Sequence, residues 1–184
     1  GGKSMLAADI LNHADIDYML EARDISEYKV ELMQENFNRC HLNKAKAVAW
    51  DALEPDERWL GQADVVIADI PCSGLGVIGR KRDIKYKMTP QAVQDIVELQ
   101  EKILKVAASY VKKGGKLLFS TCTVNKDENE AHVKWIQDTL KMTPVSLNGT
   151  LPGLVHSPTT QQGFVQLIPG MQDTDGFFIS VFEK

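Results

Sequence analysis

An apolar run at residues 64–68 leads directly into Asp69-Ile70-Pro71-Cys72-Ser73-Gly74-Leu75-Gly76, and this stretch constrains the fold most strongly. The β-branched residues of the run favour a strand buried on both faces, and Pro71 ends it because proline cannot donate to a β-ladder. Ser73 and the glycines then predict a tight turn. A carboxylate and a thiol are therefore held at the carboxyl end of a strand, where ligands bind in open α/β sheets.

A second buried strand is expected at residues 116–120, and it delivers Thr121-Cys122-Thr123. If the two strands are neighbours, Cys72 and Cys122 converge, because the carboxyl ends of parallel strands share one edge of a sheet. A thiolate is the natural attacker on an electron-poor ring carbon. The third cysteine, Cys40, lies late in a predicted helix and is interpreted as an inert buried hydrophobe.

Strands and helices alternate through most of the chain. This pattern predicts an α/β fold with a doubly wound, mostly parallel sheet, to which the C-terminal end adds antiparallel strands at one edge. Lys113-Gly114-Gly115 is expected to end a helix, and the acidic residues at 127–130 suit the start of the next one. The expected strands lie at 17–22, 45–50, 64–68, 116–120, near Val145, at 164–168 and at 177–182; the expected helices lie at 5–14, 27–39, 90–111 and 127–140, with loops at 52–63, 77–88 and 148–162.

The bulk properties predict one globular domain. The chain has 184 residues, of which 43% are hydrophobic and 25% charged, and it shows no membrane span or signal peptide. Three widely spaced cysteines favour a reducing cytoplasm over a disulfide framework, and their spacing predicts no metal site. The net charge of −4 argues against a stand-alone nucleic-acid binder.

A local basic cluster nevertheless lies in the 77–88 loop, beside the proposed site. Such a cluster is usually a solvated face, but at this position it could hold phosphates. Its members are Arg80, Lys81, Arg82 and Lys85, together with Lys87 and one acid, Asp83.

The first residues, Gly1-Gly2-Lys3-Ser4, run straight into a helical pattern. A glycine turn that opens a helix is the second half of a ligand-binding β-turn-α unit. The strand that should precede it is absent, so we expect the chain to begin in the middle of a fold. Asp24 and Asp51 each end a predicted strand, where they could accept hydrogen bonds from a nucleotide's ribose and adenine or could cap the next helix or turn.

Two cysteine motifs at this spacing resemble the Sun/nucleolar-protein family of RNA (cytosine-5) methyltransferases, and most closely its bacterial Sun/Fmu type, the ribosomal RNA small-subunit methyltransferases B. The motifs are Asp69 to Gly74 and, about fifty residues later, Ser120-Thr121-Cys122-Thr123 with Asn125, Glu128, Asn129 and Glu130. The resemblance covers essentially the whole chain. Gly1 to Ser4 is similar to the end of the family's cofactor motif, Asp24-Ile25-Ser26 to its ribose-binding segment, Asp51 to its adenine-side acid, 82–86 to the loop after the Pro-Cys motif, and Asp175 to Phe178 to its closing strand.

The resemblance implies a class I S-adenosylmethionine-dependent methyltransferase fold of the Rossmann-like type. Residues 1–184 would then be a single catalytic domain, incomplete at its N-terminus and lacking the first strand. That strand would lie in the middle of the sheet, and its loss would leave two unpaired edges. The implied cofactor is S-adenosylmethionine, with Gly1, Gly2, Lys3, Asp24, Asp51 and Asp69 as its binding residues.

The resemblance also implies a mechanism. Cys122 adds to carbon 6 of a cytosine in RNA, carbon 5 takes the methyl group, and the thiolate leaves after carbon 5 loses its proton. Cys72 would act in product release, and Asp69 would hold the edge of the base. The implied partner is RNA, most simply small-subunit ribosomal RNA, with Arg80, Lys81, Arg82 and Lys85 on its phosphates and further RNA-binding domains upstream.

Two alternatives stay open at this point. One is a DNA cytosine-5 methyltransferase, in which the Pro-Cys thiol of Cys72 is the nucleophile. The other is a truncated, non-catalytic methyltransferase-like module that serves as an interaction surface. A nicotinamide-dependent Rossmann enzyme is disfavoured, because no Gly-x-Gly-x-x-Gly follows a first strand.

Overall fold

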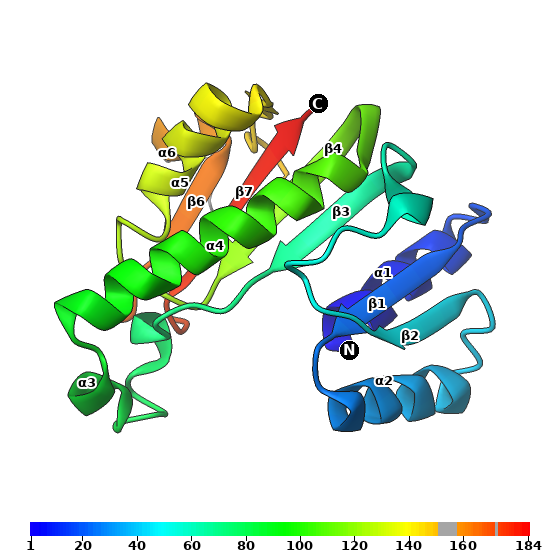
Figure 1. Cartoon of the computed structure of the whole chain (residues 1–184), viewed down its shortest axis with the longest axis horizontal. Coiled ribbons are helices and arrows are strands. Elements are labelled where there is room, and N and C mark those ends of the chain that lie inside the picture. The colour runs from blue at the N-terminus through cyan, green and yellow to red at the C-terminus, as the bar shows by residue number, and fades with distance from the viewer. Residues whose placement is uncertain (151–157, 172) are drawn as a thin grey trace. The chain divides into compact units, whose positions relative to one another are not determined.

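The computed structural model describes residues 1–150, 158–171 and 173–184. These residues form two compact units, 1–54 and 55–184 (Figure 1). The expectation that residues 1–184 make one catalytic domain stays a prediction. Part of the loop expected at 148–162 lies outside the described residues. No helix in the described ranges is long and apolar enough to cross a membrane.

The first unit is a two-stranded parallel sheet with two helices. Ser26 caps the second helix by accepting the backbone N–H of Lys29, as a serine at this position is suited to do. Met33 and Phe37 are the buried residues of that helix, and they form the core of the unit together with Ala22 and Ala45. The elements are α1 (Gly2–His13), β1 (Leu20–Asp24), α2 (Glu27–Arg39) and β2 (Ala45–Ala49).

The second unit contains a five-stranded mixed sheet in the order β3-β4-β7-β5, with β6 also paired to β7. β3 runs parallel to β4, whereas β7 is antiparallel to β4, β5 and β6. The α/β class and the antiparallel C-terminal edge are therefore confirmed. The strands are β3 (Ala63–Asp69), β4 (Val111–Thr121), β5 (Thr143–Pro144), β6 (Phe164–Leu167) and β7 (Phe177–Glu183); the helices are α3 (Ile84–Lys87), α4 (Pro90–Tyr110), α5 (Glu130–Trp135) and α6 (Pro158–Gln161), with 3-10 turns at Glu57–Trp59 and Leu75–Val77.

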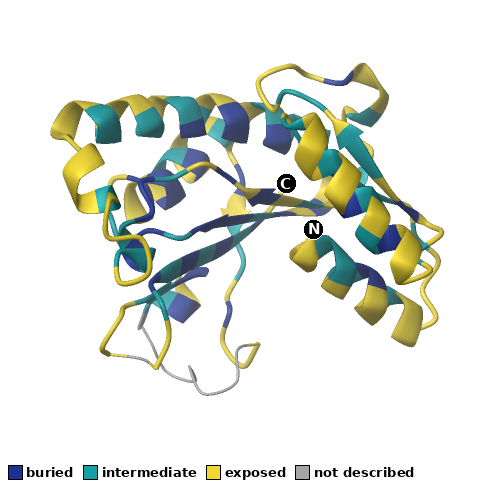
Figure 2. Cartoon of the chain, turned by 90° about the horizontal axis from the view of Figure 1, so that it is seen from below, coloured by how far each residue is buried: buried dark blue, intermediate teal, exposed yellow. Residues whose placement is uncertain are grey.

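Helix α4 covers one face of this sheet. Thr89 caps it by accepting the N–H of Ala92, and Pro90 occupies the first turn, as expected. Figure 2 shows the buried residues of α4 on its side toward the strands. They join α5 and the strands in one apolar cluster whose fully buried members are Leu104, Val111, Leu117, Phe119, Ile136, Phe178 and Phe182.

The expectation that β3 is buried on both faces is wrong. Ala68 is 6% exposed on the core face, but Val65 is 58% and Ile67 is 43% exposed on the other face. Ala68 belongs to the apolar cluster that α4 joins, whereas Val65 and Ile67 alternate to the opposite face. Among the described strands β3 pairs only with β4, and β1 pairs only with β2, so each also lies at the edge of its sheet. β-Branched residues indicated a strand here, but they could not tell how many of its faces are covered.

Two helix boundaries also differ from expectation. Helix α4 ends at Tyr110, and the segment expected to end it, Lys113-Gly114-Gly115, lies inside β4. A side chain at Gly115 would come within 2.9 Å of the Asp64 carbonyl oxygen, so the glycine serves close strand packing and not a helix cap. Helix α5 begins only at Glu130 and continues as a π-helical segment, Ile136–Leu140. The residues expected to open it are thus available for other contacts.

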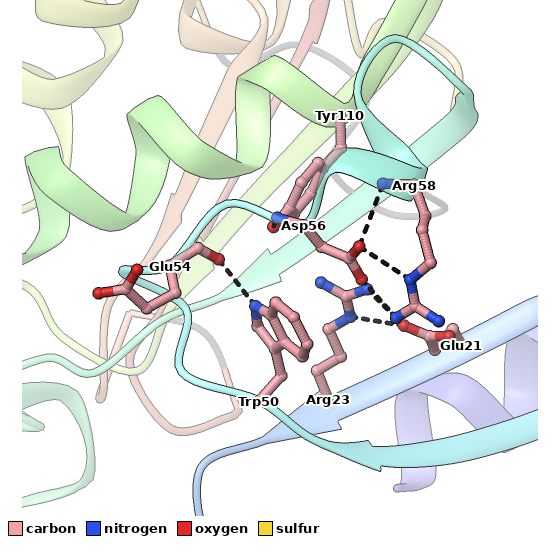
Figure 3. A network of polar contacts seen from close by, with 7 residues as sticks. All are labelled: Glu21, Arg23, Trp50, Glu54, Asp56, Arg58 and Tyr110. Carbon is pink, nitrogen blue, oxygen red and sulfur yellow. Dashed lines mark hydrogen bonds and ion pairs between the residues drawn. The ribbon is translucent and has the colours of Figure 1, made fainter.

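The turn after β2 is held by a tryptophan (Figure 3). Trp50 Nε1 donates to the carbonyl oxygen of Glu54 at 2.7 Å, and the guanidinium of Arg23 lies 5.1 Å from the Trp50 ring. Asp51 lies within this turn and accepts the N–H of Leu53 at 2.9 Å. Asp51 is therefore fixed directly after a strand end.

In the second unit, Asp56 and its hydrogen-bonding neighbours Arg58 and Tyr110 secure the start of the Glu57–Trp59 turn.

Candidate active site

The strands β3 and β4 end side by side. Asp69, the last residue of β3, is the register partner of Ser120 in β4. Register partners in a sheet point to the same face, and Ser120 Oγ donates to Asp69 Oδ1 at 3.1 Å. The carboxylate at the end of β3 is therefore oriented by the neighbouring strand.

The turns that follow these strands bring two cysteines into contact. The sulfur atoms of Cys72 and Cys122 lie 3.2 Å apart, and both side chains are half-buried. The convergence expected from the two strand ends is thus present in the structure. Cys40 differs from expectation, since it is exposed at the C-terminal cap of α2. Apolar spacing did not extend past Phe37, so the last turn of that helix faces solvent.

The contact between the two thiols shifts their pKa values in opposite directions. The pKa of Cys122 is lowered to about 6, chiefly by the hydrogen bond from the Cys72 thiol, with a smaller contribution from its own backbone N–H. Partial burial and the charge of Asp69 oppose this shift, and the charge of Lys81 supports it. The pKa of Cys72 is raised by the same hydrogen bond and by burial. The contact therefore favours Cys122 as the thiolate and Cys72 as the thiol that donates to it.

A third loop is packed against the two cysteine turns. Gly76 donates its N–H to the carbonyl oxygen of Cys122 at 3.1 Å, and Gly176 donates to the carbonyl oxygen of Gly76 at 2.8 Å. A Cβ atom on Gly76 would lie 2.3 Å from the Gly176 oxygen and 2.8 Å from that of Cys122. Only glycine admits this approach, so the Gly76–Gly176 contact locks the Asp175-Gly176 loop beside the thiols.

Buried side chains around the turns were not identified as site residues from the sequence. Asn129 is fully buried, accepts from Thr121 Oγ1 at 2.6 Å and donates to the carbonyl oxygen of Thr123 at 3.0 Å. It therefore fixes the backbone on both sides of Cys122. Ser73, Gln100 and Glu128 form a second group of buried side chains that are joined by hydrogen bonds. The only signal for Asn129 and Glu128 was their place in the motif downstream of Cys122.

The predicted RNA-binding residues lie on the segment between the first turn and α4. It was expected to be a loop, but it contains the 3-10 turn Leu75–Val77 and the short helix α3. Arg80, Lys81, Arg82 and Lys85 are all exposed. Arg80 Nε lies 3.0 Å from Asp175 Oδ2, and Lys85 Nζ lies 4.7 Å from the ring centroid of Tyr86. These contacts leave a cationic surface on the segment that follows Cys72.

The predicted cofactor residues of the first unit lie at helix and strand ends. Asp24 closes the turn before α2 by accepting the N–H of the N-cap residue Ser26 at 2.9 Å, and its other oxygen lies 3.2 Å from Lys29 Nζ. Asp51 follows the adjacent parallel strand. Gly1 is the N-cap of α1, which begins at Gly2 and not at Met5 as expected, and Lys3 is exposed in its first turn. The capping interpretation of both acids is thus present in the structure.

The same arrangement fits a nucleoside. Two carboxylates after neighbouring parallel strands offer acceptor oxygens of the kind that bind ribose hydroxyls and an adenine amino group. Asp24 and Ala49 are register partners, so the two acids leave the sheet at the same end.

Comparison with known proteins decides the family. The family model described as 16S rRNA methyltransferase RsmB/F matches residues 1–183. The chain belongs to this family. Among curated relatives, it is 36% identical over 187 residues to the probable ribosomal RNA small subunit methyltransferase B of Bacillus subtilis (strain 168), which covers all of this chain and 41% of that protein. It is 28% identical over 165 residues to the ribosomal RNA small subunit methyltransferase F of Escherichia coli O7:K1, covering 89% of this chain and 34% of that protein.

A solved structure gives the same result for the fold. The crystal structure of NSun6 from Pyrococcus horikoshii with SFG matches this RsmB/F-family chain with a TM-score of 0.78 and 25% identity. The match covers 100% of this chain and 45% of that one. The chain therefore spans less than half the length of each of these relatives. The resemblance to the Sun-type methyltransferases is confirmed.

Proposed function

We propose that this chain carries the catalytic centre of an S-adenosylmethionine-dependent enzyme that methylates carbon 5 of a cytosine in small-subunit ribosomal RNA. The observation that supports it most is the contact between Cys72 and Cys122, in a chain of the RsmB/F family. Curated relatives are named as small-subunit ribosomal RNA methyltransferases. Covalent activation of a pyrimidine ring requires an activated nucleophile, and a Cys122 thiolate that accepts a hydrogen bond from Cys72 can supply it.

Cys122 is the nucleophile in this proposal. Its thiolate adds to carbon 6 of the cytosine, which places electron density on carbon 5. Asp69, held by Ser120, hydrogen-bonds the edge of the base and keeps the ring in position. After transfer, carbon 5 loses its proton, the bond between Cys122 and carbon 6 breaks, and the ring recovers its double bond. Cys72 lies 3.2 Å from the leaving sulfur and assists its release.

S-adenosylmethionine, when bound, supplies the electrophilic methyl group. Gly1, Gly2 and Lys3 at the start of α1 would hold it together with Asp24, Asp51 and Asp69. The carboxylates at the ends of β1 and β2 fit its ribose and adenine. The Pyrococcus horikoshii relative was solved with SFG, an analogue of this cofactor, which supports the same choice.

The RNA reaches Cys122 only as an unpaired or flipped-out base, because the target carbon is stacked inside a duplex. Phosphates next to that base would bind the cationic segment of Arg80, Lys81, Arg82 and Lys85. The net charge of −4 leaves most of the electrostatic attraction for RNA to other parts of the protein. Upstream RNA-binding domains in a longer protein are therefore part of the proposal, as is a cytoplasmic location that keeps both thiols reduced.

The test is transfer of a labelled methyl group from S-adenosylmethionine to unmodified small-subunit ribosomal RNA, followed by nucleoside analysis. The proposal expects labelled 5-methylcytidine with the wild-type protein and none with Cys122→Ala. Label in DNA with retained activity in Cys122→Ala would favour the DNA enzyme with Cys72 as nucleophile. Cofactor binding without transfer to any nucleic acid would favour the interaction module.

A further inference from the structure

A buried carboxylate lies directly behind the two cysteine turns. Glu128 is 0% exposed, and its described partners are neutral donors. Its Oε2 accepts the backbone N–H of Ser73 at 2.8 Å, and its Oε1 accepts the Ser73 hydroxyl at 2.5 Å. Burying a carboxylate is costly, so these hydrogen bonds are what allows it to lie there.

The partners of Glu128 are the residues that follow each cysteine. Ser73 follows Cys72, and Thr123 follows Cys122. Thr123 Oγ1 lies 3.4 Å from Glu128 Oε1 and 2.8 Å from Ser73 Oγ. One carboxylate and two hydroxyls therefore tie the turn after β3 to the turn after β4, immediately beside the sulfur atoms.

Gln100 of α4 completes the group from the side of the helix. Its Nε2 donates to Glu128 Oε2 at 3.1 Å and to the carbonyl oxygen of Pro71 at 2.8 Å. Gln100 is fully buried, so these contacts anchor the Pro71-Cys72 turn to the long helix. The same carboxylate thus receives donors from three segments: one cysteine turn, the other cysteine turn and α4.

We propose that Glu128 is a positioning residue that holds the two cysteine turns together and keeps the Cys72 thiol in hydrogen-bond contact with Cys122. Glu128 is fully buried and cannot touch a substrate, so it acts through Ser73 and Thr123. Its importance for methyl transfer rests on the proposed function. Its effect on the thiol pair does not, because that pair can be observed without RNA or cofactor.

The two oxygens of the Glu128 side chain accept from donors on both Ser73 and Gln100. Ser73 N–H and Gln100 Nε2 point at one oxygen, and the Ser73 hydroxyl points at the other. The change Glu128→Leu keeps the approximate volume but removes both acceptor oxygens, so the Ser73 N–H loses its acceptor and Gln100 Nε2 loses one of its two acceptors. A buried unsatisfied donor is expensive, and the turns are expected to move apart to relieve it.

The reactivity of Cys122 reports this movement. The titratable groups that shift the pKa of Cys122 are Cys72 in the turn after β3, Asp69 at the end of β3 and Lys81 on the segment before α3. Among these, Cys72 has the largest influence, through its hydrogen bond. Separation of the turns removes that bond, and the thiolate of Cys122 then forms only at higher pH.

The experiment measures iodoacetamide alkylation of Cys122 against pH by peptide mass spectrometry, in a Cys40→Ser background. In Glu128→Leu we expect the midpoint to rise by at least about one pH unit, which lowers the rate at pH 5 about tenfold. The matched control is Glu130→Leu, the same change at an exposed position two residues away, which should leave the profile unchanged. Thr123→Ser keeps the hydroxyl and should also behave as wild type.

An unchanged profile in folded Glu128→Leu would overturn the proposal. Should that variant fail to fold, Ser73→Ala and Thr123→Val decide, since each removes one hydroxyl from the same group and should raise the midpoint in the same direction. A wild-type profile in both would also overturn it. A raised midpoint in a protein that transfers no methyl group to RNA would uphold the positioning role and refute the proposed function instead.

Discussion

The sulfur atom of Cys72 lies 3.2 Å from that of Cys122, although fifty positions separate the two residues in the sequence. The contact arises because β3 and β4 are parallel neighbours that end in register, Asp69 beside Ser120. Each strand passes its chain into a turn that carries one cysteine. The chemistry of the site therefore depends on the relation between two turns rather than on either cysteine alone.

Removing Cys72 should make Cys122 less acidic. Because the Cys72 thiol is the main cause of the lowered pKa of Cys122, Cys72→Ala should raise that pKa from about 6 toward the ordinary range of a thiol. The rate of Cys122 alkylation, which in the wild type rises through pH 6, should then rise at a higher pH. Cys122 alkylation that keeps its midpoint in Cys72→Ala would contradict the hydrogen bond.

A methyl group at Gly76 should separate the loops around the thiols. The new Cβ atom of Gly76→Ala meets the Gly176 and Cys122 carbonyl oxygens, so overpacking should lower the free energy of unfolding by about 1–3 kcal/mol. The matched control is Gly79→Ala, since a Cβ atom at Gly79 meets nothing within 4 Å. Urea denaturation of both variants makes the comparison. Equal stabilities would show that the Gly76–Gly176 contact is looser than described.

Acid should destabilise the protein through His132. This side chain is 1% exposed, its ring stacks on Phe119 at 5.8 Å, and burial lowers its pKa below the ordinary 6.5. The unfolded chain takes up a proton near pH 6.5, whereas the folded chain does so only at a lower pH. The free energy of unfolding therefore keeps its full value with respect to His132 above pH 6.5. It falls as the pH drops below 6.5, with a limiting slope of about 1.4 kcal/mol per pH unit.

The measurement for His132 is urea unfolding between pH 5 and pH 8. His132→Gln should flatten the slope below pH 6.5, whatever its effect on stability at pH 8. His13→Gln, at an exposed position in α1, is the matched control and should keep the wild-type slope. A wild-type slope in His132→Gln would assign the acid sensitivity to another group.

The basic segment should set the salt dependence of RNA binding. If Lys81 and Arg82 each contact one phosphate, Lys81→Ala and Arg82→Ala should each reduce the slope of log affinity against log salt concentration by about 0.7–0.9. Lys134→Ala removes a charge from α5, outside the segment, and should leave the slope unchanged. Filter binding at several salt concentrations tests this, and equal slopes in all three variants would exclude the segment from the interface.

Much of the site could be predicted from local pattern. The apolar runs before Asp69 and Thr121 indicated strands, and parallel strands in an α/β fold present their carboxyl ends at one edge. That reasoning led to Cys72, Cys122 and Asp69 together. The capping of α2 by Ser26 and of α4 by Thr89 followed from side-chain chemistry that acts within one turn.

The parts that could not be predicted depend on tertiary contacts. Glu128 was expected only as one of the acidic residues that suit the start of a helix. Its partners, Ser73 and Gln100, come from segments far away in the sequence. The exposure of Val65 and Ile67 likewise depends on which face of β3 packs against the apolar cluster. The glycines before Lys116 indicated a helix end, although Gly115 in fact permits close strand packing.

The most direct test of the account is to look for a covalent complex between the protein and small-subunit ribosomal RNA in the presence of S-adenosylmethionine. The account predicts that Cys72→Ala accumulates a denaturation-resistant adduct on a gel, because the addition of Cys122 proceeds while its release is slowed. It predicts no adduct with Cys122→Ala. An adduct that forms in Cys122→Ala and disappears in Cys72→Ala would contradict it and reverse the roles of the two cysteines.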